Sequence, residues 1–179
     1  MASELLKCID DLSTIGFRVR GVVSDNHSTN VCAFKNILEN HEGDRQHFIK
    51  LPDLDHKIYL FFDSVHLVKN VRNNLLNGKK FVFPGFNFYV GCEQASTEPG
   101  SICWQNLRTV HERDSKLKAH LRKAPKLSFK AIHPQDKKQN VNLALAIFDD
   151  KTIAAVKSYL PERTDIINFL KVINMWWTI

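Results

Sequence analysis

Two short runs with a strand-type pattern, each followed by an aspartate and then by a helix-type pattern, most constrain the fold of this chain. The first run covers residues 17–24 and precedes Asp25, and the second covers residues 58–62 and precedes Asp63. Apolar residues at helical spacing stand before, between and after these runs. Such alternation is typical of α/β proteins with parallel strands. We therefore predict an α/β fold with both aspartates at the carboxyl ends of neighbouring strands, where open sheets place functional groups.

The other elements follow from apolar periodicity and from capping residues. A first helix is expected between a cap at Ser3 and Gly16, and a later one begins at a cap on Ser64. Residues 41–56 are predicted to be a polar loop. Residues 78–100 are interpreted as a short extended segment and a connector that carries Phe81, Phe83, Phe86, Phe88 and Tyr89. The remaining expected helices cover residues 29–39, 64–76, 102–111, 116–123, 142–148, 152–159 and 166–177.

Charge is distributed unevenly along the 179 residues. Residues 1–63 hold 7 Lys/Arg against 10 Asp/Glu, a net charge of −3, whereas residues 64–138 hold 14 against 5, a net charge of +9. Residues 139–179 hold 4 of each sign. A basic middle beside a mildly acidic start suggests a polyanionic partner. The alternative is an ordinary solvated Lys/Arg surface.

Asp25 and Asp63 are the first candidate site. Two carboxylates on neighbouring strand ends could share a divalent metal, and Mg²⁺ prefers such oxygen ligands. Phosphoryl transfer with two metal ions usually needs at least three acidic ligands, however. The alternative is that each aspartate only caps the helix that follows it.

A second feature begins at Asp63 and continues along the next helix. His66 stands three residues after Asp63, so the two side chains could share a metal or a hydrogen bond. Lys69 and Arg72 are also three apart and would share a helix face that could contact phosphate. An ordinary exposed helix face is the alternative.

Several common functional motifs are missing from the sequence. His111 and Glu112 begin an H-E-x-x-H pattern, but Ser115 stands at its fifth position, and the chain has no P-loop or G-x-S-x-G motif. The 4 Cys form no C-x-x-C pair, which argues against a structural zinc site. No apolar run approaches the length of a membrane span, so no membrane partner is expected.

The two aspartate regions, residues 21–30 and 62–76, together resemble the P-element-type DNA transposases, which include transposase-derived THAP-domain proteins. Residues 125–148 and 169–177 are similar to the same family. The resemblance implies a partial RNase H-like parallel-sheet core over residues 1–80, a connector over residues 81–101, and a helical GTP-binding-type insertion domain over residues 102–179, truncated at its end.

What the family does gives specific expectations for this chain. Its members cut and join DNA in the nucleus with Mg²⁺ and three acidic residues. Asp25 corresponds to the second of these acids and is the expected catalytic residue and metal ligand, whereas Asp63 and His66 are assigned supporting roles. The segments that carry the other two acids are expected to lie outside this chain. We therefore expect a fragment that keeps nucleic-acid binding but not a complete catalytic triad, so that whether it is an enzyme stays open.

The resemblance also implies GTP and DNA as ligands. Asn140 stands where relatives carry a lysine, and the lost charge would weaken phosphate binding. Partners implied are DNA at transposon ends and a second transposase chain. The expected nucleotide contacts are Lys126, Lys138, Asn140, Val141 and Asp149, and the expected DNA phosphate contacts are Lys69 and Arg72.

Two other readings are retained. One is a domesticated, non-enzymatic protein that binds DNA or regulates a full-length transposase. The other is an unrelated α/β enzyme that uses Asp25, Asp63 and His66 with a metal ion. A partial core would also expose a strand edge and apolar surface. The isolated chain is therefore predicted to be marginally stable or prone to aggregation.

Overall fold

The computed structural model describes residues 1–41, 47–84 and 98–178. Their contacts group the chain into two compact units, Met1–Leu67 and Val68–Ile179. Each unit is described by itself.

The division between the units falls inside helix α3 (Ser64–Leu76), and the predicted domain bounds at residues 80 and 101 stay a prediction. The cause is packing, because Val68 and Leu75 on the later turns of α3 are completely buried in the core of the second unit.

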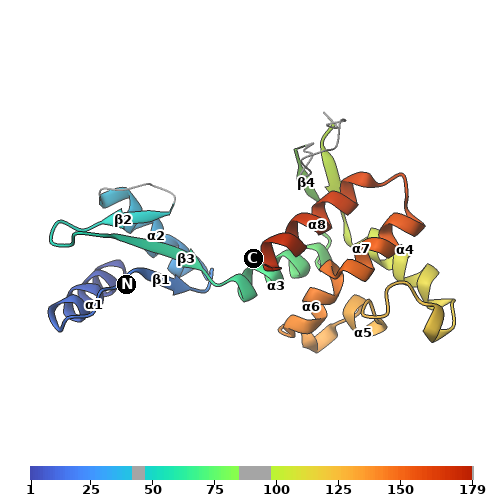
Figure 1. The fold of residues 1–179 in the computed structure, drawn as a ribbon, viewed down its shortest axis with the longest axis horizontal. Helices are drawn as coiled ribbons and strands as arrows, with labels where there is room; N and C mark the ends of the chain where they lie inside the picture. The colour runs from blue at the N-terminus through green and yellow to red at the C-terminus, as the bar shows by residue number, and fades with distance from the viewer. Residues whose placement is uncertain (42–46, 85–97, 179) are drawn as a thin grey trace. The chain divides into compact units, whose positions relative to one another are not determined.

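The first unit combines a three-stranded sheet with two helices (Figure 1). β1 and β3 are parallel neighbours, as predicted, and Ser24 at the end of β1 is in register with Phe62 at the end of β3. β2 pairs antiparallel with the other edge of β3, so the sheet is mixed and the prediction of a parallel sheet is only partly correct. β2 lies inside the predicted polar loop, and its three residues are too few to show an alternating pattern. The elements are α1 (Ala2–Thr14), β1 (Gly21–Ser24), α2 (Ser28–Asn40), β2 (Phe48–Lys50) and β3 (Lys57–Phe62).

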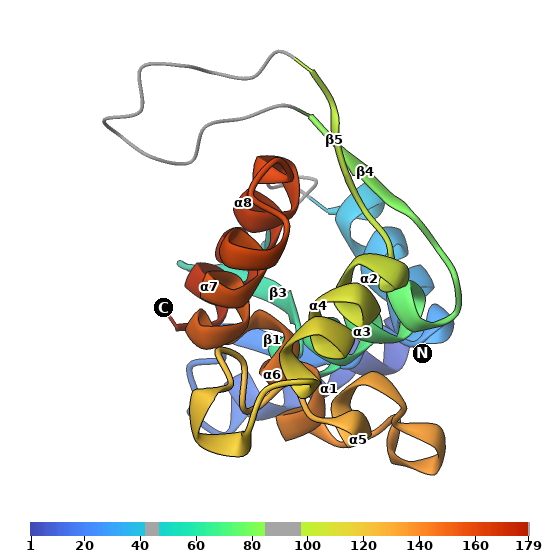
Figure 2. The ribbon, with the colours of Figure 1, turned by 90° about the vertical axis from the view of Figure 1, so that its right-hand side faces the viewer.

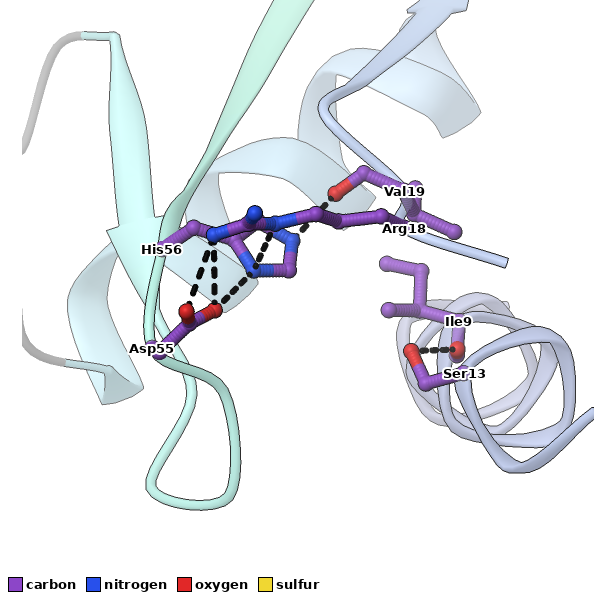
Figure 3. Close-up of polar contacts among 6 residues, drawn as sticks. All are labelled: Ile9, Ser13, Arg18, Val19, Asp55 and His56. Carbon is purple, nitrogen blue, oxygen red and sulfur yellow. Dashed lines mark hydrogen bonds and ion pairs between the residues drawn. The ribbon is translucent and has the colours of Figure 1, made fainter. Parts of the chain in front are cut away.

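The segment between α1 and β1 is held by side chains and by one backbone hydrogen bond, in which the N–H of Tyr59 in β3 donates to the carbonyl of Arg20 at 3.0 Å. α1 ends at Thr14, and Gly16, where the stop was predicted, follows the C-cap Ile15 with a φ of 92° that suits a residue without Cβ. The predicted strand began at residue 17, but only its last four residues enter the ladder. Arg18 donates to both carboxylate oxygens of Asp55, at 3.0 and 2.9 Å, and His56 Nε2 lies 2.8 Å from the carbonyl oxygen of Val19 (Figure 3). These contacts attach the segment to the turn that precedes β3.

The two faces of this sheet differ. One face packs with α1 and α2 around six buried residues, namely Ile9, Phe34, Ile37, Ile49, Ile58 and Leu60. On the other face Val23, Tyr59 and Phe61 are 66%, 40% and 51% exposed. The rings of Tyr59 and Phe61 stand side by side with centroids 6.0 Å apart. The expected apolar surface is therefore present, and aggregation of the chain stays a prediction.

The second unit is mostly helical, as predicted (Figure 2). Its core contains Leu107 from α4, Ile147 from α6 and Ile166 from α8, each completely buried. No helix in the described part of the chain is long and apolar enough to span a membrane. The elements are the rest of α3, then β4 (Phe81–Phe83), β5 (Gly100–Ile102), α4 (Trp104–Ser115), α5 (Phe129–Ile132), α6 (Val141–Phe148), α7 (Asp150–Tyr159), α8 (Thr164–Thr178) and two 3₁₀ turns (Ala119–Leu121 and Gln135–Lys137).

A short hairpin precedes α4, where an extended segment and a connector were predicted. β4 and β5 pair antiparallel, with Phe83 in register with Gly100. A Cβ at Gly100 would lie 2.2 Å from the Phe83 ring and 2.9 Å from the Cβ of Asp165, so only glycine fits there. The carboxylate of Asp165 accepts the N–H of Ser101 at 3.0 Å and joins the hairpin to the start of α8. The predicted aromatic residues Phe86, Phe88 and Tyr89 lie outside the described residues.

Candidate functional site

Asp25 and Asp63 directly follow the paired ends of β1 and β3. The backbone N–H of Asp63 donates to the carbonyl of Ser24 at 2.7 Å, which holds the two strand ends together. Both carboxylates therefore lie at the same edge of the sheet, as the alternating pattern predicted.

Local hydrogen bonds keep Asp25 ionised. Its Oδ1 accepts the backbone N–H of His27 at 3.0 Å and the side-chain amide of Asn30 at 2.8 Å. These bonds, the one from His27 foremost, lower the pKa of Asp25 below its usual value, with a smaller electrostatic contribution from His66. The side chain of His27, not Asp25, caps α2 by accepting from Thr29. Asp25 is thus a fixed, exposed carboxylate, the type of ligand that Mg²⁺ prefers.

Asp63 and His66 are directly bonded. Oδ2 of Asp63 lies 2.5 Å from Nδ1 of His66, and Oδ1 accepts the backbone N–H of Val65 at 3.0 Å. The carboxylate therefore caps α3, a role that the sequence assigned to Ser64, and it also orients the imidazole. Within residues 1–41, 47–84 and 98–178, no three His, Cys, Asp or Glu side chains are grouped to hold a metal ion. The two aspartates and the histidine supply fewer acidic ligands than two-metal chemistry needs.

Lys69 and Arg72 are not on an exposed helix face, so the alternative of an ordinary exposed face is wrong, and their contact with phosphate stays a prediction. Lys69 is 8% exposed and Arg72 is 0% exposed. Lys69 donates to the side chain of Gln139 at 3.1 Å, and Arg72 donates to the backbone carbonyl of Lys138 at 2.6 Å. Burial lowers the pKa of Arg72. The long stems of these residues pack in the second unit, which a pattern based on polar side chains does not reveal.

The predicted nucleotide contacts separate into two groups at opposite ends of α6. Asn140 caps the start of the helix by accepting the N–H of Leu143 at 3.1 Å, with Val141 beside it and Lys138 just before it. Asp149 follows the end of the helix and forms an ion pair of 2.7 Å with Lys126. Because α6 has eight residues, the two groups lie about 12 Å apart along its axis.

The group at the end of α6 lines a pocket. Lys126 and Asp149 share a cavity of about 280 Å³ with Trp177 and Asn174 of α8. The hydrogen bond with Asp149 raises the pKa of Lys126. Trp177 packs against the core but is only partly buried, and its place in the pocket could not be seen from helical spacing.

Residues 116–123 were predicted to be a basic helix, but they form an exposed loop with a single 3₁₀ turn, Ala119–Leu121. The buried carboxylate of Asp114 causes this, because it accepts the backbone N–H groups of Lys123 and Ala124 at 2.8 and 3.1 Å. It also accepts the hydroxyl of Tyr159 at 2.9 Å. Between Asp114 and Asp136 the sequence has six Lys/Arg and no acidic residue. The loop therefore presents positive charge on a fixed backbone.

Comparison with known proteins identifies the fold. No protein-family model and no curated protein matches the sequence. A solved structure, the Drosophila P element transposase strand transfer complex, matches with a TM-score of 0.71 and 22% sequence identity. The match covers 97% of this chain and 36% of the other chain, so this chain spans little more than a third of that transposase. The predicted resemblance is thus confirmed for the fold: the chain has the mixed α/β architecture of part of P element transposase.

Proposed function

We propose that this chain is part of a P-element-like cut-and-paste DNA transposase that keeps DNA binding but lacks a complete set of catalytic carboxylates. In this proposal residues 1–80 belong to an RNase H-like core, residues 81–101 connect it, and residues 102–179 belong to a helical insertion domain of the GTP-binding type. The fold match to a strand transfer complex supports DNA as the partner. The same features would serve a domesticated protein that binds DNA or regulates a full-length transposase in the nucleus.

The observation that carries DNA binding is the loop over residues 116–123. Its cations are exposed, no acidic residue stands between Asp114 and Asp136, and the buried carboxylate of Asp114 fixes its backbone. A positively charged loop of fixed shape can neutralise DNA phosphates without first losing much conformational entropy. Lys69 and Arg72 do not support direct contact with DNA in this structure, because both are buried.

The test is the salt dependence of duplex DNA binding, measured by fluorescence anisotropy. We expect the double variant Lys116→Gln/Lys118→Gln to weaken binding and to reduce the slope of log affinity against log salt by about two. The matched control is Lys7→Gln/Lys35→Gln, which removes the same charge from exposed positions of the first unit. Equal loss in both variants, or no loss in either, would disprove the role of the loop.

Catalysis by the chain alone is not expected. Asp25 would supply one oxygen ligand to Mg²⁺, which would neutralise charge on the reacting phosphate, and Asp63 would hold His66 beside that position. Two further acidic residues would have to come from outside these 179 residues. Duplex DNA incubated with the chain and Mg²⁺ should therefore stay intact. Cleavage that disappears in Asp25→Asn would instead favour a small metal-dependent enzyme.

Nucleotide binding is a second candidate function, and the pocket at the end of α6 supports it. A carboxylate can accept two neighbouring N–H groups of guanine, and Trp177 can pack against the base. To bind the base, Asp149 would have to break its ion pair with Lys126. At the other end of α6, Asn140 stands where the resemblance implies a lysine, so we expect weak affinity for the phosphates.

Tryptophan fluorescence with GTP and with ATP would test this candidate. We expect GTP to change the fluorescence more than ATP, and Asp149→Asn to remove the difference, because an amide cannot accept both N–H groups. Glu162→Gln, an exposed change in the same unit, is the control. Equal responses to both nucleotides would rule out guanine recognition by Asp149.

A further inference from the structure

A second pocket of the second unit lies in the segment that links the basic loop to α6. It has a volume of about 280 Å³ and is lined by residues of one continuous stretch, including Phe129, Lys130, His133, Asp136 and Lys137. That volume is close to the lower limit of about 300 Å³ for small-molecule sites. Neither the catalytic acids nor the pocket at Asp149 includes any of these residues.

Local structure turns an aromatic ring outward at this pocket. Ser128 caps the single turn of α5 by accepting the N–H of Ala131. Ala131 and Ile132 are 0% and 1% exposed and fix the turn against the core. The side chain of Phe129 is left 63% exposed.

Phe129 is paired with His133 one turn later. The two ring centroids are 4.5 Å apart and the planes are tilted by 35°. A single exposed phenylalanine is common and needs no explanation. Here, however, the exposed ring and an imidazole stand together on the rim of a pocket, where they offer an aromatic surface to a flat ligand.

The charges around the pocket favour an anionic ligand. Lys130 stands between the two aromatic residues in sequence and Lys137 stands after them; both lysines line the pocket and are exposed. Neither lysine forms an ion pair within the described part of the chain. Asp136 is the one acidic side chain in the lining. Aromatic rings interleaved with cations are the usual surface for unpaired nucleotides, because bases stack on the rings and phosphates meet the cations.

We propose that this pocket binds one unpaired nucleotide of a DNA strand, with its base on Phe129 and His133 and its phosphate at Lys130 and Lys137. The proposal rests on the DNA-binding function given above and adds a contact that a perfect duplex cannot make, because the faces of its bases are already stacked. Stacking tolerates any base, so the pocket distinguishes single-stranded from paired nucleotides and not one sequence from another.

The experiment compares two DNA probes with the full 179-residue chain. One is a perfect duplex, and the other is the same duplex with a three-nucleotide gap that places 2-aminopurine opposite the missing bases. We expect the gapped probe to bind more tightly and its 2-aminopurine fluorescence to be quenched. Phe129→Leu keeps an apolar side chain but removes the ring, and it should weaken gapped binding at least about fivefold, with duplex binding unchanged within about twofold.

Controls separate this contact from general effects. Val82→Ala changes another exposed apolar residue, 67% exposed on β4, outside the basic loop and both pockets, and should leave the preference for the gapped probe intact. Lys130→Gln/Lys137→Gln should weaken gapped binding more than duplex binding. Circular dichroism of each variant should match that of the unaltered chain, because Phe129 is exposed.

Each outcome has a definite meaning. Duplex binding without any preference for the gapped probe would overturn the pocket proposal and leave the DNA-binding function standing. Absence of binding to either probe would refute both. Competition by free deoxynucleoside monophosphate at the affinity of the gapped probe would show that the pocket takes a free nucleotide and not a strand.

Discussion

The two units differ in charge, in core size and in the chemistry they carry. The first unit has 7 Lys/Arg against 10 Asp/Glu, a net charge of −3, and the second has 18 against 9, a net charge of +9. Among the described residues, the main apolar cluster of the first unit has 6 buried members and that of the second has 19. The candidate catalytic carboxylates lie in the first unit, and the basic loop and both candidate nucleotide pockets lie in the second.

This contrast indicates a division of tasks. A carboxylate site needs fixed acidic ligands and repels DNA unless metal ions neutralise it, whereas a binding surface needs accessible cations. A core as small as that of the first unit, with one sheet face uncovered, supplies little hydrophobic stabilisation. We expect the second unit to be the stable, DNA-binding part, and the first to depend on other chains or segments to cover Val23, Tyr59 and Phe61.

The strongest test of the contrast is a pair of core truncations. Leu107→Ala should lower the free energy of unfolding of the second unit by about 2–5 kcal/mol without changing hydrogen exchange in β1 and β3. Ile58→Ala should unfold the first unit, whose total stability is small. It should leave hydrogen exchange in the second unit unchanged. Loss of hydrogen-exchange protection in both units with either variant would show that the two units unfold together, and the contrast in stability between them would be wrong.

Substitution of Arg72 tests how a buried charge affects the stability of the second unit. Nε and Nη1 of Arg72 are buried without a hydrogen-bond partner within the described chain, so its charge costs stability. Arg72→Met should change the free energy of unfolding by no more than about 1 kcal/mol, or raise it, whereas Arg72→Ala should cost about 2–5 kcal/mol through the cavity. Urea denaturation measures both. A large loss in Arg72→Met would mean that the guanidinium itself holds the segment at Lys138.

Matched glycine variants compare the closeness of packing in the two units. Gly100→Ala should cost about 1–3 kcal/mol, because the new methyl group would overlap Phe83 and Asp165. Gly21→Ala should cost much less, since its Cβ would lie 3.4 Å from the carbonyl oxygen of Tyr59, an ordinary contact. Thermal melts of the two variants would show the difference. Similar melting temperatures would contradict the tight approach at Gly100.

The smallest expected effect is the pH dependence contributed by Asp165. Burial alone would raise its pKa, but hydrogen bonds from Arg163 and from the N–H groups of Ser101 and Ile166 outweigh it and lower the pKa. This stabilisation is therefore full at neutral pH and is lost as the pH falls below the usual value of 3.8 through the lower folded value. Asp165→Asn should cost about 1 kcal/mol or less at pH 7, and the difference should shrink at pH 3. Urea titrations at both pH values measure it, and a difference that grows in acid would contradict the assigned sign.

The sequence by itself determined the elements with strong periodicity and clear boundaries. The parallel pair ending in Asp25 and Asp63, the stop at Gly16 and the helices from α6 to α8 follow from local apolar spacing and capping, which act over only a few residues. The contact between Asp63 and His66 also follows from their spacing on one helix. The resemblance to a transposase added expectations for the fold, the ligands and the site residues. Of these, the structural match tests only the fold.

Tertiary structure decided everything that depends on distant partners. It buried Arg72 against the carbonyl of Lys138, closed residues 116–123 into a loop through Asp114, and brought Lys126, Asp149 and Trp177 to one pocket. These arrangements join side chains to groups in other elements of the chain, and no local pattern encodes their meeting. Side-chain type gives charge and size, but only packing decides whether a cation meets solvent, a carbonyl or a ligand.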